Sequence, residues 1–241
     1  MAEKRIYNYL KHQSFQPDIL SLFINPFFFV RYAYYKNIRN YIPYLKGRLL
    51  DFGCGRKPFE KLFSVDEYIG IDIETTGHDH KNSKVDMYYD GKHLPFENET
   101  FDSLFCSEVL EHVFNPDEVL PELNRVMKKG AKILITTPFC WNEHETPYDY
   151  ARYSSFGIKH LLEKHGFKII VTKKSGNFAR VNFQLWALYF FELFKKLGRT
   201  GHILSLFFII PINLLGSVLL LILPKNDSVY FTNIVLAEKI N

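Results

Sequence analysis

From Arg48 onward, short apolar runs alternate with longer amphipathic stretches along the chain. The short runs end at glycine or polar residues and predict buried strands, whereas the longer stretches predict helices. Strands that alternate with helices are typical of an α/β fold, in which helices cover both faces of a mainly parallel sheet. The runs that we expect to form strands are 48–53, 68–73, 84–89, 101–106, 131–137, 167–173 and 229–239.

Two of the predicted helices have clear end signals. For the first, Asn115 is the expected cap, Pro116 takes the first helical position, and two carboxylates follow near the positive end of the helix dipole. This helix is expected to stop at Lys128-Lys129-Gly130, because cations favour the negative end and glycine commonly follows the last turn. The second is expected to run from Ser154 or Ser155 to 164–166.

The stretch LLDFGCGRKPF, from Leu49 to Phe59, carries the densest chemical signal. A predicted strand runs into Asp51, Gly53 and Gly55, and a helix is expected after them. Glycines at the carboxyl edge of a parallel sheet let the backbone turn sharply and approach a ligand closely. Asp72 closes the next strand and is placed to accept hydrogen bonds from ribose hydroxyls. Together these features predict an adenosine-type ligand rather than a simple tight turn.

Two common nucleotide classes are disfavoured by the same stretch. A dinucleotide fingerprint would need a third glycine, and Pro58 stands there instead. The sequence also contains no phosphate-binding G-x-x-x-x-G-K-[ST] motif. A ligand without a pyrophosphate remains the best fit.

The segments DFGCG, YIGIDI and YDGKHLPFENETFDSLFCSEVLEHV resemble those of class I S-adenosylmethionine-dependent methyltransferases, over roughly 47–167 with a last strand near Val229. The resemblance implies a doubly wound, Rossmann-like sheet of seven strands, mostly parallel, with an antiparallel last strand. It implies S-adenosyl-L-methionine as cofactor. By this resemblance, the methionine and ribose part of the cofactor would contact Asp51, Gly53 and Gly55, and the ribose hydroxyls would contact Asp72. The adenine edge would contact Asp90 and Gly91, and the sulfonium side would lie between Cys106 and Ser107.

The chain departs from this family at Arg56-Lys57-Pro58, where many members have Thr-Gly. The pattern G-x-K-P resembles a subset associated with cell-surface polysaccharide and glycolipid modification. How the turn lies against the ligand is left open by this departure.

The loop from Thr137 to Ser155 leaves the fifth strand at the ligand edge of the sheet and contains candidate catalytic residues. Methyl transfer to a hydroxyl benefits from a base that removes the hydroxyl proton. His144 is our first choice because histidine titrates near neutrality, with Glu145 or Asp149 orienting it. The alternative is a solvated polar loop. The pattern H-x-x-P-x-D-x-x-R-Y resembles one in the same polysaccharide-associated subset.

Two further groups of polar residues are interpreted mainly as structural, with catalysis by the first group, Glu108, Glu111 and His112, as the less favoured alternative. Glu108, Glu111 and His112 belong to the S-x-V-L-E-H pattern, which in the resembling family usually serves ligand positioning and helix packing. The run 78–80, His-Asp-His, has no third ligand at a suitable spacing and is interpreted as a solvent loop. We therefore assign no metal ion from the sequence.

The overall composition narrows the partners and the compartment. The net charge of +4 and the lack of a dense basic run do not indicate nucleic-acid binding. Three cysteines, an odd number placed in or beside apolar runs, suit buried thiols in a reducing compartment. The first twenty residues contain no apolar core of a secretory signal. These features predict a cytoplasmic protein.

The run from Ile203 to Leu223 has twenty-one residues without a charge, enough to cross a bilayer. It lies between the last two predicted strands, which must pair within one sheet. A single membrane crossing would place the final strand on the far side of the membrane, so it is excluded if that strand forms. Pro211 is expected to break the run, and the preceding segment 183–197 is short and charged. We expect a helical insertion on the inner face of the membrane that lies in the interface or dips in and returns, with aromatic residues at the headgroup level.

The expected organisation has three parts. An aromatic helical segment, 1–46, precedes the methyltransferase domain, 47–174 and 228–241, which is interrupted by the hydrophobic insertion 175–227. The insertion and the N-terminal segment could instead pack on the sheet or form a homodimer interface.

The sequence thus predicts a membrane-associated methyltransferase whose acceptor is a hydroxyl of a lipid-linked sugar or another amphiphile. A second reading is a small-molecule or quinone-type methyltransferase in which the insertion caps an apolar pocket. A third is a non-catalytic module that binds the cofactor and anchors a partner glycosyltransferase.

Overall fold

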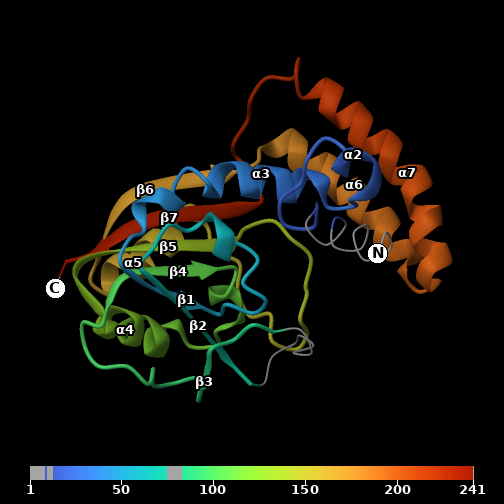
Figure 1. Ribbon diagram of the computed structural model, residues 1–241. Helices are drawn as coiled ribbons and strands as arrows, with labels where there is room; N and C mark the ends of the chain where they lie inside the picture. Colours follow the sequence, from blue (N-terminus) through green and yellow to red (C-terminus); the bar gives the residue numbers. More distant parts are fainter. Residues whose placement is uncertain (1–8, 10–12, 75–82, 241) are drawn as a thin grey trace. The chain divides into compact units, whose positions relative to one another are not determined.

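A computed structural model of the chain describes residues 9, 13–74 and 83–240 (Figure 1). Its sheet has seven strands in the order β3-β2-β1-β4-β5-β7-β6. All pairings from β3 to β5 are parallel, and β7 runs antiparallel to β5. The predicted fold class is confirmed. The strands are β1 Arg48–Phe52, β2 Glu67–Ile73, β3 Met87–Tyr89, β4 Phe101–Ser107, β5 Met127–Pro138, β6 Phe167–Ser175 and β7 Thr232–Lys239.

The described helices fall into two groups along the chain. Those before β1 and between β6 and β7 are α2 Ser21–Ile24, α3 Phe28–Ile38, α6 Phe178–Lys195 and α7 Gly198–Leu219. Those between strands β4 and β6 are α4 Pro116–Val126 and α5 Ser155–Lys164, and short 3-10 helices occur at η1 Ile42–Tyr44, η2 Glu60–Leu62 and η4 Leu110–His112.

The core of the sheet lies on its central strands. Leu49 and Leu50 of β1, Leu104 of β4 and Ile133 of β5 are fully buried. Central strands of a parallel sheet are covered on both faces, so nearly every side chain is apolar. This explains why these runs are recognisable in the sequence although they lack strict alternation.

The first predicted helix ends earlier than expected, and its cap differs. Helix α4 stops at Val126, and β5 starts at Met127, opposite Phe101 of β4. Strand pairing with β4 therefore decides the conformation of the Lys-Lys-Gly segment. Asn115 makes no capping bond; its amide donates instead to Oε1 of Glu118, at 2.9 Å. Helix α5 begins as predicted, with the Ser154 hydroxyl accepting the Gly157 N–H at 3.1 Å.

The helix expected after Gly55 is wrong, since only the three-residue η2 forms there. Two aromatic side chains of this stretch, Phe59 and Phe63, pack edge-on against Phe105 of β4, with ring centroids 6.2 and 5.1 Å away. Lys57 has φ of +50°, which a continuous α-helix does not allow. Packing onto the sheet replaces the helix.

The described residues divide into two compact units. One comprises 38–173 and 232–241, and the other comprises 1–37 and 174–231, so the N-terminal segment and the insertion belong to the same unit. We predicted them as separate segments, with boundaries at 46, 174 and 227. The tertiary packing described next explains the grouping.

Within this second unit, polar side chains tie the N-terminal segment to α6 and α7. The buried amide of Gln184 donates to the Pro26 carbonyl at 2.8 Å and accepts from the Val30 N–H at 3.2 Å. Asn213, also buried, donates to the Leu22 carbonyl at 3.0 Å. These two polar residues of the apolar helices are therefore used for internal packing.

Helices α6 and α7 lie side by side, with Phe190 and Phe208 stacked at 4.5 Å between ring centroids (Figure 1). Pro211 lies inside α7, which continues through it, so the expected break is wrong. Among the described residues, one helix, α7, is long and apolar enough to cross a membrane. In its most apolar stretch of 18 residues, 22% is buried. Core helices of soluble proteins can meet the same two criteria.

Candidate functional site

The turn after β1 is shaped by two glycines. Gly53 has φ of +71°, and a Cβ there would lie 2.4 Å from Cγ2 of Val109 in the loop after β4. Gly55 has φ of +48°, with open space where its Cβ would be. Positive φ favours glycine, and the missing side chains let the backbone approach both a neighbouring loop and a ligand. The turn therefore has the shape that was predicted.

Asp72 fixes this turn from the neighbouring strand. Its Oδ2 accepts the Gly55 N–H at 2.9 Å, and its Oδ1 accepts the N–H of Ile73 at 2.9 Å. Strand β2 pairs with β1 in parallel, which brings Asp72 to the same edge as the glycines. The structure thus brings together the glycine turn and the acidic residue that the sequence predicted to form one site.

Asp51 is the buried acid of the site. It accepts a hydrogen bond from the Tyr68 hydroxyl on β2. Burial raises the pKa of Asp51 to about 7, although the Tyr68 hydrogen bond and the charge of Lys57 act in the opposite direction. The carboxyl is therefore poised to change its charge near neutral pH, when a cationic ligand binds close to it.

Lys57, in the segment that departs from the family pattern, has a structural role. Its side chain is buried and forms an ion pair with Asp86, which also accepts the Gly70 N–H at 2.7 Å. A Cβ on Gly70 would lie 2.3 Å from Cε of Lys57, so the lysine occupies the space left by that glycine. Sequence reasoning missed this pair, and the glycine in the middle of an apolar strand was the available signal.

Asp90 and Gly91 follow β3 at the same edge of the sheet. Oδ1 of Asp90 accepts the N–H groups of Lys92 and His93, each at 2.8 Å, and these bonds lower the pKa of its carboxyl. Gly91 has φ of +83°. The pairing of Ile73 with Tyr89 places this turn beside the end of β2, which is compatible with the predicted contact to the adenine edge.

Cys106 and Ser107 end β4, between the glycine turn and β5. The Cys106 side chain is fully buried in the core, and burial raises the pKa of its thiol well above the ordinary value. A ligand at this edge would therefore meet the backbone of Cys106 rather than its sulfur. Ser107 pairs with Thr136 of β5 at the end of the strand and is half-buried.

His144 lies in the loop after β5 and is held by Asp149. Oδ2 of Asp149 is 3.2 Å from Nδ1 of His144 and accepts the backbone N–H of His144 at 2.9 Å. The Asn142 carbonyl lies 3.3 Å from the same Nδ1. Two acceptors at Nδ1 favour the tautomer that has its proton there and a lone pair on Nε2.

Arg152 in turn holds Asp149. Its guanidinium donates to both carboxylate oxygens, at 2.5 and 2.6 Å. Burial raises the pKa of Asp149, but the bonds from Arg152 and His144 outweigh it and hold the value at about 2. Burial and the nearby His112 lower the pKa of His144, against the opposing effect of Asp149. His144 is thus neutral at physiological pH, as a base must be.

Glu145, which follows His144 in the chain, lies beside the loop after β4. Its Oε1 lies 3.4 Å from Nε2 of His112, in the loop after β4. The rings of His112 and His144 meet edge-on, with centroids 4.9 Å apart. Glu111 lies beside them and is fully buried. The structure therefore joins the two polar loops into one cluster, a contact that their separation in sequence concealed.

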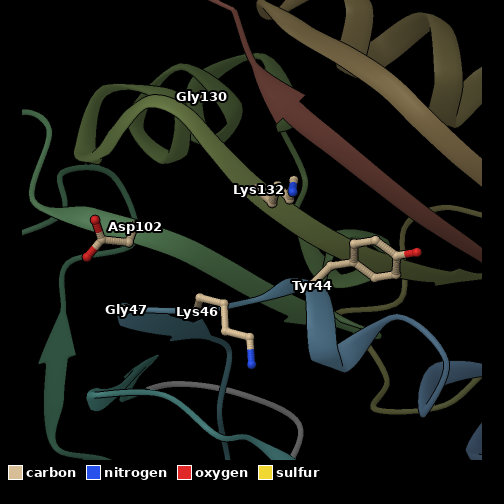
Figure 2. Close-up of a pocket in the computed structure, with 6 residues that line it drawn as sticks. All are labelled: Tyr44, Lys46, Gly47, Asp102, Gly130 and Lys132. Atoms are coloured by element: carbon tan, nitrogen blue, oxygen red, sulfur yellow. The ribbon is translucent and has the colours of Figure 1, made fainter.

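A depression of about 320 Å³ lies at the opposite edge of the sheet, and Figure 2 shows its lining residues. Gly47 precedes β1 and Asp102 lies near the start of β4, whereas the predicted ligand residues follow the ends of these strands. At ~3.3 Å per residue, the two edges are roughly 15–20 Å apart. Asp102 is also engaged by Lys128, at 2.7 Å. This depression is not the cofactor site.

Residues 29–172, well over half of the chain, match the family described as methyltransferase domain. The chain belongs to this family. Its fold is that of the S-adenosylmethionine-dependent methyltransferases. The matched range includes the glycine turn, Asp72 and the Asp90 turn, which lie at the carboxyl edge of the sheet.

Other comparisons agree with this placement. A methyltransferase-domain protein of known structure from Archaeoglobus fulgidus, described as SAM dependent, shares 20% identity at a TM-score of 0.53, with 97% of this chain and 100% of that one covered. Phosphoethanolamine N-methyltransferase 2 of Haemonchus contortus, solved with S-adenosyl-L-methionine, shares 17% identity at a TM-score of 0.52, with 92% of this chain and 56% of that one covered. Both likenesses concern the fold.

A sequence relative is also found among curated proteins. The uncharacterized protein MJ1123 of Methanocaldococcus jannaschii is 37% identical over 100 residues, which make up 41% of this chain and 47% of that protein. The matched stretch thus spans less than half the length of the curated relative. Because this relative is itself described as uncharacterized, it assigns no substrate to the chain.

Proposed function

We propose that this protein transfers a methyl group from S-adenosylmethionine to a hydroxyl of a lipid-linked sugar or another amphiphile, at the inner face of the membrane. The observation that carries the proposal is the position and hydrogen bonding of His144. It is neutral, held at Nδ1 by Asp149, and located at the carboxyl edge that also carries the glycine turn. When bound, S-adenosylmethionine supplies an electrophilic methyl group on a positively charged sulfur.

The residues of the chain would share the work in a simple way. Asp51 and Asp72, with the glycine turn, would bind the cofactor and set the direction of its methyl group. Alignment of acceptor and methyl supplies much of the rate in such a displacement. His144 would take the hydroxyl proton on Nε2, while Asp149 stabilises the imidazolium that forms.

The amphiphilic acceptor is supported by the apolar surface of α6 and α7. Trp186, Phe207 and Ile203 are 60%, 76% and 70% exposed, although each is large and apolar. Large exposed apolar side chains gathered on two neighbouring helices indicate a site for a membrane, a partner or a ligand. The resemblance of G-x-K-P and of the loop around His144 to polysaccharide-associated enzymes favours a lipid-linked sugar among these.

Incubation of the full chain with methyl-labelled S-adenosylmethionine and a lysate of its source cells tests the proposal. We expect label in the lipid extract or in lipid-linked glycan. Label confined to water-soluble molecules would favour the small-molecule reading, in which α6 and α7 serve another purpose. Measurable cofactor binding with no labelled product in any fraction would favour the non-catalytic module.

Two substitutions separate the cofactor from the base. Asp72→Ala should weaken S-adenosylmethionine binding roughly tenfold or more, because charge-assisted hydrogen bonds are lost. His144→Ala should lower turnover and leave cofactor affinity nearly unchanged, and His160→Ala, at an exposed position of α5, is the matched control. Cofactor binding is measured by calorimetry. Unchanged affinity in a folded Asp72→Ala variant would contradict the site assignment.

A further inference from the structure

The cluster of Glu111, His112 and His144 contains a carboxylate that folding leaves unsatisfied. Glu111 is fully buried in η4, and neither of its carboxylate oxygens has a hydrogen-bond partner among the described residues. Its backbone is firmly placed, since its carbonyl accepts the N–H groups of Tyr150 and Ala151 at 2.8 and 3.2 Å. A buried carboxyl group without partners is costly unless a ligand or proton satisfies it.

His112 presents a nitrogen lone pair to the same space. Its Nδ1 lies 2.8 Å from the Tyr148 carbonyl, which can only accept, so the ring proton is on Nδ1. Nε2 is buried and has no hydrogen-bond partner in the described part of the chain. Two carboxylate oxygens face it, Oε1 of Glu145 at 3.4 Å and Oε1 of Glu111 at 3.8 Å, and both separations exceed the usual length of an N–H···O hydrogen bond.

His144 completes the set from the loop after β5. Its Nδ1 faces Asp149 and the Asn142 carbonyl, so its Nε2 is the nitrogen with a lone pair. Each of the three residues offers one ligand atom, and these atoms lie within 4.8 Å of one another. Imidazoles whose Nδ1–H is held by a carboxylate or a backbone carbonyl are typical of protein metal ligands.

We propose that Glu111, His112 and His144 bind a divalent transition-metal ion. Two imidazoles and one carboxylate suit Zn²⁺, Fe²⁺ or Co²⁺ better than Mg²⁺ or Ca²⁺, which prefer oxygen ligands. A tetrahedral ion with bonds of ~2.1 Å needs ligand atoms about 3.4 Å apart, so side-chain rotations that shorten the separations by up to about 1.4 Å suffice. Three protein ligands leave a coordination position open.

The open position gives the ion a use that rests on the proposed function. An acceptor hydroxyl bound there would release its proton to water, because a divalent cation lowers the pKa of oxygen ligands. The acceptor oxygen then forms a bond to the methyl carbon while the carbon–sulfur bond breaks, and the electron pair stays on sulfur, giving an uncharged thioether. In this state His144 would be a metal ligand and not the base, and the cation would act as a Lewis acid that lets the bound hydroxyl lose its proton to water.

Metal binding can be measured without cofactor or acceptor. The full chain is freed of metal with a chelator and titrated with Co²⁺, followed by calorimetry and visible absorption. We expect one equivalent of Co²⁺ to bind and to show the absorption bands of nitrogen ligands. Zn²⁺ should displace it, whereas Mg²⁺ at the same concentration should not. His112→Asn should weaken binding at least about 100-fold, and Asp149→Asn about 10-fold, because it supports the His144 ligand. His160→Asn, at an exposed position of α5, should change nothing.

Folding does not obscure the result. Glu111 is fully buried, so His112→Asn and Asp149→Asn carry the test, and a circular dichroism melt verifies that each is folded. Co²⁺ binding that is absent, or that persists unchanged in both folded variants, overturns the proposal.

Failure of the metal site and failure of the proposed function are distinguishable. Co²⁺ binding at these residues supports the site even where no acceptor is methylated. Turnover that survives chelator and the His112→Asn change, but is lost in His144→Ala, overturns the role of the cation and leaves His144 as the base.

Discussion

At the scale of single residues, Asp51 links the fold to the proposed cofactor. The residue is 3% exposed, its carboxyl accepts a hydrogen bond from the Tyr68 hydroxyl, and burial raises the pKa of the carboxyl to about 7. A bound cationic sulfonium would favour the ionised form, which the apo protein has only in part at neutral pH. Cofactor binding and proton release are therefore coupled at this residue.

We expect the affinity for S-adenosylmethionine to increase as the pH rises through about 7, with release of a fraction of a proton on binding at pH 7. Calorimetry in two buffers with different ionisation enthalpies measures that fraction. Asp51→Asn should abolish the pH dependence. Asp102→Asn, at the opposite edge of the sheet, should keep it, and equal proton release by the Asp51 variant would contradict the assignment.

The Asp51 carboxyl also affects the stability of the cofactor-free protein, which is expected to fall as the pH rises, whereas cofactor affinity rises. Its pKa is 3.8 when unperturbed and about 7 in the folded state, so the folded protein binds the proton more tightly. The contribution of Asp51 to stability is thus fully present below about pH 4 and is lost as the pH rises through about 7. Asp51→Asn should flatten this part of the urea-unfolding profile.

At the scale of elements, the turn after β1 depends on close contact between two loops. Gly53 must lack a side chain because Val109, in the loop after β4, fills the space beside it. The same loop continues into Glu111 and His112, so the position of the turn and that of the polar cluster are coupled. A disturbance at the glycine is expected to reach both.

Gly53→Ala should destabilise the protein by about 2–4 kcal/mol, from the positive φ and from overpacking against Val109, and should impair cofactor binding. Gly130→Ala is the matched control, since φ there is +76° but the space is open. The control should cost only about 1–2 kcal/mol and leave cofactor binding intact. Urea unfolding and calorimetry give the two quantities, and equal losses in both variants would refute the packing argument.

At the scale of the whole molecule, the chain devotes one of its two units to apolar helices with much exposed surface. Leu221 and Ile222, just beyond α7, are 84% and 75% exposed, and Phe207 of α7 is 76% exposed. Exposed apolar side chains near Lys195, Lys196 and Lys225 suit an anionic membrane surface, where the cations meet the headgroups.

We expect the full chain to float with vesicles that contain anionic lipid. Replacing Phe207, Leu221 and Ile222 by serine should weaken partitioning at least about 100-fold, since each buried apolar side chain contributes ~1.5–3 kcal/mol. Phe156→Ser is the control, because Phe156 is 82% exposed but lies on α5 of the sheet unit. A dimer in solution that the triple variant abolishes, with no vesicle binding by either protein, would contradict the membrane proposal.

Much of the fold could be predicted because it depends on local patterns. Apolar runs and end signals identified the seven strands, and α5 begins at its predicted serine cap. Where a segment meets a distant one, the pattern was insufficient. The strand at Met127 replaced a predicted helix end by pairing with Phe101, and no helix formed after Gly55 because Phe59 and Phe63 pack on β4.

By itself, the sequence determined the α/β class, the family motifs and the residues of the glycine turn, because the alternation of strands and helices and the chemistry of turns follow from neighbouring residues. Only the tertiary structure decided which polar groups meet. His144 and Glu111 are 33 positions apart in the numbering, and they come together because β4 and β5 are adjacent parallel strands whose ends share one edge. The partners of a buried charge depend on burial and distance, which the three-dimensional fold alone sets.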